Sequence, residues 1–191
     1  MRQKTILFAL AAALLAACTK QDDGPALPIP IYGAGDTSKG WASMRKNGLE
    51  MDASALAQRC HHDPDQLVLF FLTFDSLGVL SEYFVFECFA RRTEKFELCS
   101  ARDSDCSHQA DYWTTYDDQA EDLYSLSQRK PSFLEVTAVD SAEGWIEGRF
   151  DLHFCIDTQQ NKQITGRAKS NPANPDHVRF SQGYFRVRLP D

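Results

Sequence analysis

Alternating apolar and polar side chains indicate that residues 144–156 form a long β-strand. Apolar residues occupy every second position from Ile146 to Ile156, and Gly148 stands in the same phase. Because successive strand side chains point to opposite faces of a sheet, this pattern predicts one buried face and one face in water. The predicted wet face carries, in order, Glu147, Arg149, Asp151 and His153.

Asn47-Gly48 predicts a hairpin within residues 41–54. This dipeptide favours a two-residue turn, because both central positions need a positive φ angle. With that turn, Met44 faces Met51 on an apolar face, and Arg45 faces Glu50 on a polar face. Turn chemistry and polarity pattern therefore predict the same register.

Further strands are expected along the middle of the chain. Residues 67–74 are continuously apolar, which predicts a strand buried on both faces. After a turn, residues 79–90 predict another strand, in which Cys88 is in phase with Phe84 and Phe86. Residues 133–139 should pair with 144–156 as an antiparallel hairpin. Shorter strands are expected at 95–100, 112–116 and 123–126.

The C-terminal part of the chain predicts one more strand after a long excursion. Residues 157–175 are polar and hold two Asn-Pro steps, so no regular structure is expected there. In residues 178–189 the apolar phase changes across 181–183, which predicts a bulge or tight turn. If this strand lies beside 144–156, Arg186 and Arg188 should meet Glu147 and Asp151.

No segment predicts an amphipathic helix longer than two turns. The fold class is therefore all-β, with a single antiparallel β-sandwich or β-barrel domain of about nine strands over residues 40–191.

Residues 1–17 have the pattern of a signal peptide. Arg2 and Lys4 precede an apolar run over residues 6–17 that is too short to cross a bilayer as a helix. The run ends in Leu-Ala-Ala-Cys at Cys18, which resembles a bacterial lipobox, whose cysteine is acylated and becomes the first mature residue. An ordinary secretory signal with an incidental cysteine is the alternative.

Acylation of Cys18 would anchor the protein to a membrane without crossing it. Two or more acyl chains hold a protein stably, whereas one chain holds it marginally. Thr19 follows the cysteine instead of an inner-membrane retention aspartate, so we expect the outer membrane. The acidic residues Asp22 and Asp23 leave open whether the anchored protein faces the periplasm or the cell surface. Proline and glycine are frequent over residues 18–39, which predicts a lipidated flexible tether.

Charge and cysteine content narrow the partners and the compartment. The net charge of −7 over 191 residues gives no electrostatic footprint for nucleic acid. Five cysteines follow Cys18, and in an oxidising compartment they predict disulfides with at least one thiol left over. A polar segment separates Cys99 and Cys106, which are our candidates for a local disulfide.

Two segments, one rich in histidine and one acidic, contain potential metal ligands. Cys60, His61 and His62 are adjacent, and His108 is their only plausible complement, but adjacent ligands seldom close a zinc tetrahedron. The carboxylates of residues 117–122 lack the glycine and spacing of a calcium loop. We expect a solvated loop and a solvated acidic turn, and no cofactor.

Asp151 and His153 are the only candidates for a general base and its orienting group. Side chains two positions apart on a strand lie about 7 Å apart, which is too far for a direct hydrogen bond without another strand. We therefore expect a solvated charge ladder here.

Three groups of residues resemble a group of uncharacterised Bacteroidota outer-membrane lipoprotein domains. The first is Trp41 with Lys46-Asn47-Gly48 near the start of the domain. The others are Asp140 with Gly144, Ile146, Gly148 and Phe150, and Val178 and Phe180 with Gly183, Phe185 and Val187. These motifs are structural, and the resemblance implies a lipid-anchored β domain but no activity.

Three functional hypotheses follow. The first is a noncatalytic envelope lipoprotein that binds a ligand or a partner, protein or glycan, or has a structural role. The second is a carrier that encloses a small hydrophobic ligand, because the central strands are rich in phenylalanine. The third is a surface hydrolase that uses Asp151 and His153.

Overall fold

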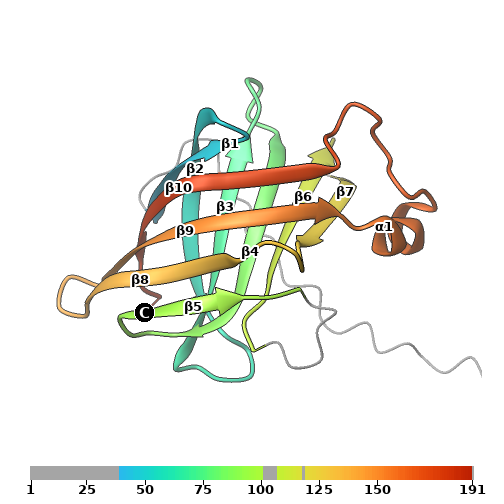
Figure 1. Ribbon diagram of the computed structural model, residues 1–191. Coiled ribbons are helices and arrows are strands. Elements are labelled where there is room, and N and C mark those ends of the chain that lie inside the picture. The colour runs from blue at the N-terminus through green and yellow to red at the C-terminus, as the bar shows by residue number, and fades with distance from the viewer. Residues whose placement is uncertain (1–38, 101–106, 118, 191) are drawn as a thin grey trace, which may run out of the picture. The chain divides into compact units, whose positions relative to one another are not determined.

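Antiparallel β-strands make up most of residues 39–100, 107–117 and 119–190, which are the residues that the computed structural model describes (Figure 1). All of them belong to one unit, Gly33–Asp191. The elements are, in chain order, β1 (Gly40–Lys46), β2 (Leu49–Arg59), β3 (Gln66–Phe74), β4 (Leu80–Ala90), β5 (Glu94–Leu98), β6 (Ala110–Tyr116), β7 (Gln119–Leu126), β8 (Ser132–Asp140), β9 (Trp145–Ile156), α1 (Thr158–Thr165) and β10 (His177–Arg188).

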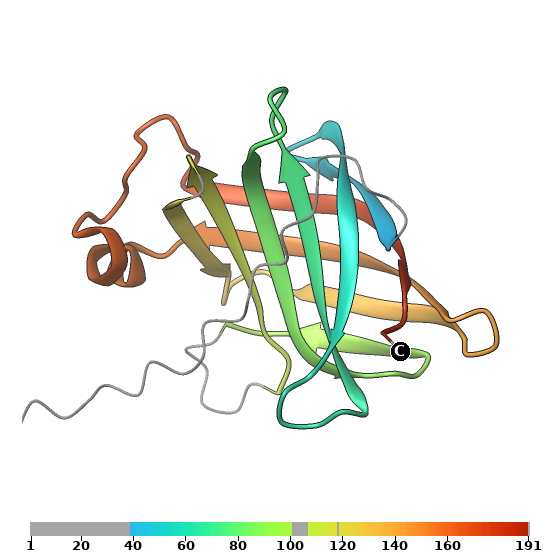
Figure 2. The same ribbon diagram turned by 180° about the vertical axis from the view of Figure 1, so that it is seen from behind.

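Hydrogen bonds between β9 and β10 close eight of these strands into a barrel. The order around the ring is β10-β1-β2-β3-β4-β6-β7-β9, and β8 and β5 extend from β9 outside it. From both sides, the layer of β10, β9, β8 and β5 lies across the layer of β2, β3 and β4 (Figures 1 and 2). The predicted all-β domain is confirmed, and of the two architectures left open it is the barrel, with ten strands.

Aromatic side chains fill the interior of the barrel. The ring of Phe71 lies with its centroid 5.3 Å from that of Phe150 and 5.6 Å from that of Phe185. Phe84 adds a contact with Phe180 at 4.8 Å. These side chains are completely or almost completely buried. Close packing of large rings from opposite walls is the main source of hydrophobic stabilisation available to a barrel of this size.

Two reciprocal glycine–phenylalanine pairs join β9 to β10. Gly148 is the register partner of Phe185, and Gly183 is the partner of Phe150. A Cβ atom added at Gly148 would lie 2.4 Å from the Phe185 ring and 2.3 Å from the Glu135 carbonyl oxygen. One added at Gly183 would lie 2.3 Å from the Phe150 ring. Each ring therefore occupies the space that a side chain on the opposite strand would need.

The first hairpin and the β9 strand follow the sequence prediction. Asn47 and Gly48 have φ angles of 49° and 89°. Met44 pairs with Met51 and Arg45 with Glu50, and the Arg45 Nη2 and Glu50 Oε1 atoms are 2.9 Å apart. The predicted register shift in the last strand is also present, between Phe180 and Gly183. These features are confirmed because a two-residue turn and a period-2 pattern are local signals.

A bulge in β4 changes the predicted position of Cys88. Leu69 pairs with Phe86 but Leu67 pairs with Phe89, so Glu87 and Cys88 together oppose one residue of β3. The bulge places Phe89 in the core, and the expectation that Cys88 shares a face with Phe84 and Phe86 is wrong. Cys88 instead forms a disulfide with Cys60, with 5.4 Å between the Cα atoms.

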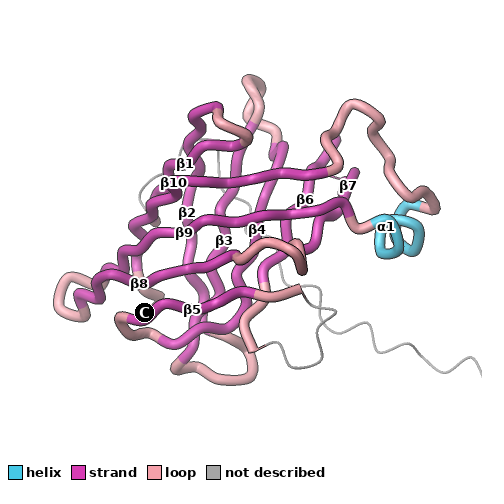
Figure 3. Tube along the Cα trace, viewed as in Figure 1, coloured by secondary structure: helices cyan, strands magenta, loops and turns pink. Residues whose placement is uncertain are grey.

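The polar excursion before the last strand contains a helix that the sequence did not predict. In α1, which lies beyond the end of β9 (Figure 3), the Asp157 carboxylate accepts hydrogen bonds from the backbone N–H groups of Gln159 and Gln160. Gly166 ends the helix in a left-handed conformation, with φ 75°. Among the described residues no helix is long and apolar enough to pass through a bilayer.

We predict that Gly183→Ala lowers the free energy of unfolding by about 1 to 3 kcal/mol, because the new methyl group overlaps the Phe150 ring. The nearest atoms to this site all belong to that ring. Adding Phe150→Leu should therefore cost less in the Gly183→Ala background than in the wild type, with a coupling of about 0.5 kcal/mol or more in a urea-denaturation cycle. Additive effects of the two substitutions would contradict this account of the pair.

Candidate functional site

The outer faces of β9 and β10 carry a compact group of chemically active side chains. Asp151, His153 and Cys155 point outward from β9, and His177 and Arg179 point outward from β10. In the sheet register His177 is opposite Cys155, and Arg179 is opposite His153. Neighbouring strands therefore bring together residues that lie more than twenty positions apart in the chain.

Asp151 is the anion of this group. Its carboxylate accepts hydrogen bonds from Arg179 Nε at 3.3 Å and Arg179 Nη2 at 2.9 Å. The Nε2 atom of His153 lies 3.4 Å from Asp151 Oδ1. The two side chains lie closer than the expected spacing of about 7 Å, but the hydrogen bonds of the Asp151 carboxylate come from Arg179 on the neighbouring strand.

The surroundings of His153 favour the neutral form of its imidazole over the charged form. Partial burial lowers the pKa of His153, and the positive charges of Arg179 and Lys130 lower it further. Asp151 acts in the opposite direction but does not outweigh burial. A neutral imidazole offers one nitrogen as an acceptor.

The thiol of Cys155 lies beside an imidazole. Cys155 Sγ and His177 Nδ1 are 3.2 Å apart, and Cys155 is the free cysteine among the described residues. Ser125 of β7 is the register partner of Cys155 on the other side, and Asp111 of β6 is the partner of Ser125. An acid, a hydroxyl group, a thiol and an imidazole therefore form one row across four strands.

A cleft opens over this row because β7 and β8 both pair with the same edge of β9. β7 pairs with its C-terminal end, β8 with its N-terminal part, and residues 127–131 leave the sheet between them. The Ser127 N–H group donates to the His153 carbonyl oxygen at 2.7 Å, and the His153 N–H group donates to Ser132 Oγ at 2.9 Å. His153 thus fixes both ends of the departing segment.

The cleft has a volume of about 650 Å³ and an excess of positive groups. Its cationic or titratable lining residues include Arg129, Lys130, His153, His177 and Arg179. Arg129 and Lys130 are exposed, and neither forms an ion pair with any described residue. Among the described residues of the lining, the one acidic residue is Asp157, which is buried and whose Oδ2 atom accepts a hydrogen bond from Ser125 Oγ at 2.7 Å.

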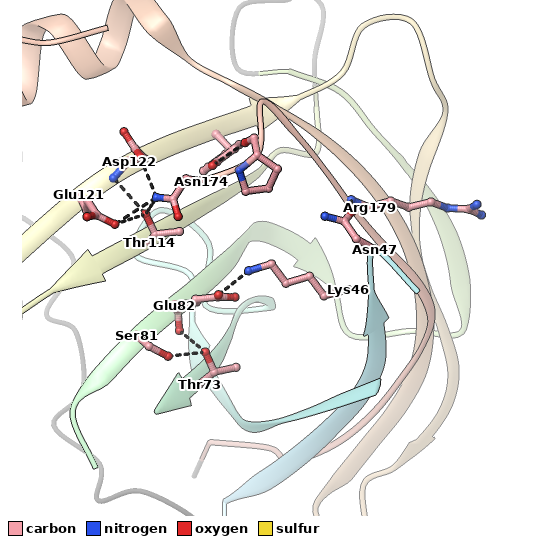
Figure 4. A network of polar contacts seen from close by, with 12 residues as sticks. Lys46, Asn47, Thr73, Ser81, Glu82, Thr114, Glu121, Asp122, Asn174 and Arg179 are labelled. Atoms are coloured by element: carbon pink, nitrogen blue, oxygen red, sulfur yellow. Dashed lines mark hydrogen bonds and ion pairs between the residues drawn. The ribbon is translucent and has the colours of Figure 1, made fainter. Parts of the chain in front are cut away.

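A network of polar side chains that bind one another is found at one end of the barrel (Figure 4). Asp122 accepts hydrogen bonds from the Ser170 N–H group at 2.6 Å and from Asn174 Nδ2 at 2.8 Å. Lys46 Nζ pairs with Glu82 inside the same end. The contacts of Asp122 hold the segment after α1 against β7, and the Lys46–Glu82 pair joins β1 to β4, so both are structural.

Burial of Asp122 corrects the prediction of a solvated acidic turn over residues 117–122. Its side chain is 1% exposed, and its hydrogen bonds come from residues nearly fifty positions away. The described residues contain no group of three potential ligands placed to hold a metal ion.

The other predicted site residues lie apart. His61 and His62 are in an exposed loop with ring centroids 5.2 Å from each other, while His108 lies against Phe96 at 4.9 Å. The sulfur of Cys60 is in the disulfide with Cys88, which removes it from the proposed ligand set. Arg186 meets Glu147 at 3.4 Å, as predicted, but Asp151 is paired with Arg179.

Two predictions fall on residues that the structure does not describe. Cys18 and Cys106 are both outside the described ranges. Acylation of Cys18 and the Cys99–Cys106 disulfide therefore stay predictions.

The sequence analysis missed the Cys155–His177 pair. The sequence predicts at least one leftover thiol without assigning it to Cys155, and the partner of Cys155 depends on the register between β9 and β10. The predicted adjacency of these strands was the only signal from which the pair could have been found.

Comparisons of the chain with family models, with curated proteins and with solved structures give no match. The arrangement of the site must therefore be interpreted from its own chemistry.

Asp111, the register partner of Ser125, predicts a measurable pH dependence. Burial, together with the negative charges of Glu87 and Asp157, raises the pKa of Asp111 to about 6. In the unfolded chain an aspartate ionises near pH 3.9. Between these values the folded state retains a proton that the unfolded state releases, so this group's contribution to stability falls as the pH rises from about 4 to 6.

We predict that Asp111→Asn stabilises the protein at pH 7.5 by about 1 to 3 kcal/mol, because it removes an unfavourably buried charge. The difference between the variant and the wild type should disappear below about pH 4, where Asp111 is protonated in both states. Urea denaturation of both proteins across this range measures the difference. A variant that is less stable than the wild type at pH 7.5 would show that the ionised carboxylate is stabilising.

Proposed function

We propose that the chain is an outer-membrane lipoprotein, anchored through acyl chains on Cys18, whose barrel binds a small anionic ligand in the cleft over β9 and β10. The observation that carries the binding proposal is the pair of exposed cations, Arg129 and Lys130, which line a cleft of about 650 Å³ and form no ion pair with the described part of the chain. This volume is in the usual range for small-molecule sites.

The charge of the cleft contrasts with that of the whole chain. The net charge is −7, yet three of the cleft's lining residues are lysine or arginine. In an acidic protein a local positive field attracts anions to one place, while the negative charge of the rest of the protein repels them. The location of the cations therefore favours a specific site. Arg179 is held by Asp151, which leaves Arg129 and Lys130 as the groups available to an incoming anion.

The outer cleft is a better candidate for the ligand than the barrel interior. A carrier of hydrophobic molecules needs internal space, and here Phe71, Phe84, Phe150 and Phe185 meet across the centre. The hydrolase alternative relies on Asp151 and His153, and the Asp151 carboxylate is already engaged by the guanidinium of Arg179. Reversible binding therefore accounts for more of the geometry than either alternative.

The anchoring part of the proposal predicts that Cys18→Ser blocks acylation. In cells grown with labelled palmitate, the wild-type chain should take up label and sediment with the outer membrane. The Cys18→Ser variant should take up none and appear in the soluble fraction, because no acyl chain remains to hold it. Cys155→Ser is the matched control and should keep the label. Label or membrane sedimentation that is unchanged in Cys18→Ser would refute the anchor.

The binding part predicts that the cleft's free cations decide anion affinity. Purified protein carrying Cys18→Ser is titrated calorimetrically with inorganic pyrophosphate, a minimal polyanion. Arg129→Gln with Lys130→Gln should weaken binding by about tenfold or more, since two charge-assisted contacts are lost.

Lys162→Gln with Arg167→Gln is the control for this experiment, because it removes the same charge from the helical excursion outside the cleft lining. It should leave the affinity nearly unchanged. Equal losses in both double variants would indicate a nonspecific charge effect, and the cleft would not be the site.

A further inference from the structure

The outward position of Cys155 is unusual for a structural cysteine. The even-numbered side chains of β9 form the core, whereas Cys155 is on the outer face, partly exposed, in the lining of the cleft. Its sulfur contacts His177 Nδ1 at 3.2 Å, and the His177 side chain is exposed. A nucleophile and a base within hydrogen-bond distance, both open to a cavity, are the minimal arrangement for thiol chemistry.

The groups around the pair favour attack by the sulfur. His177 faces Cys155 from β10, His153 lies two positions along β9, and Asp157 lies on the far side with its carboxylate bound to Ser125 and to the first turn of α1. Asp176 is drawn away by Lys169, whose Nζ atom is 2.7 Å from Asp176 Oδ1. Among the described residues that line the cleft, the exposed cations without an ion pair are Arg129 and Lys130.

We propose that the Cys155–His177 pair undergoes thiol–disulfide exchange with an anionic low-molecular-weight disulfide bound in the cleft. The sulfur of Cys155 attacks one sulfur of the small disulfide while its proton passes to His177. A new bond forms between Cys155 and that sulfur, the old sulfur–sulfur bond breaks, and the leaving thiolate receives the proton from His177. The small disulfide is the oxidant, so the exchange is balanced without another reactant.

The cleft gives this exchange its selectivity. Arg129 and Lys130 would bind the carboxylates of an anionic disulfide and hold it over the sulfur, whereas a cationic disulfide would be repelled. The product is a protein that carries a small anionic adduct, removable by a reducing thiol. This inference deepens the proposed anion binding, on which its selectivity rests.

The test uses the Cys18→Ser protein and two probes of opposite charge. Glutathione disulfide is the anionic probe and cystamine the cationic one, and intact-mass spectrometry with peptide mapping follows adduct formation over time. We expect one glutathione per chain at Cys155, formed faster than the cystamine adduct after each rate is divided by that of a free cysteine peptide. Cys155→Ser should form no adduct.

Two further variants separate the roles of the base and the cations. His177→Gln should slow both probes by about tenfold, because the proton acceptor is lost whatever the charge of the disulfide. Arg129→Gln with Lys130→Gln should slow glutathione disulfide alone. Circular dichroism spectra and urea midpoints confirm that each variant is folded.

The outcomes distinguish this inference from the proposed function. A Cys155 that reacts no faster than the free peptide, or a His177→Gln variant that reacts at the wild-type rate, overturns the inference even where pyrophosphate binding is intact. If Cys155 reacts faster than the free peptide and the reaction depends on His177, but the two probes react at equal rates, the thiol pair is supported and its anion selectivity is overturned. Pyrophosphate binding by the Cys18→Ser protein, measured with no disulfide present, tests the cleft separately from the thiol chemistry.

Discussion

The barrel depends on two glycines that make room for two phenylalanines. Gly148 and Gly183 stand opposite Phe185 and Phe150 on the strands that close the ring, and no side chain larger than hydrogen fits at either position without movement of a ring. The two rings then reach across to Phe71 of the far wall. Closure and core packing are thus one interaction, since the pairing of β9 with β10 also positions the rings that fill the interior.

A filled interior shifts the chemistry to the outside of the barrel. Barrels that carry ligands inside keep space between their walls, but here aromatic rings from both walls are in contact. The outer face of β9 provides what the interior does not. Because β7 and β8 share one edge of that strand and the chain leaves the sheet between them, a cleft opens directly over His153 and Cys155.

The sequence was sufficient for features that depend on local signals. The Asn47-Gly48 turn determined the register of the first hairpin, and the alternation around Phe150 identified β9 and its buried face. It was insufficient at Cys88, where a one-residue bulge changes which face of the sheet the side chain is on. It was also insufficient for the eight-residue helix α1, which is stabilised mainly by its caps, Asp157 and Gly166. Such short helices bury little apolar surface, so no hydrophobic period reveals them.

The candidate site was beyond sequence analysis for a different reason. Each of its members looks ordinary alone, since Cys155 is a leftover thiol, His177 follows a loop, and Arg129 and Lys130 belong to a polar turn. Only the pairing of β9 with β10 on one edge and with β7 on the other places Asp111, Ser125, Cys155 and His177 in one row. Because the same register brings Gly148 to Phe185, the constraint that packs the core also aligns the groups of the outer face. A slip of one residue in that register would therefore remove the site together with the core.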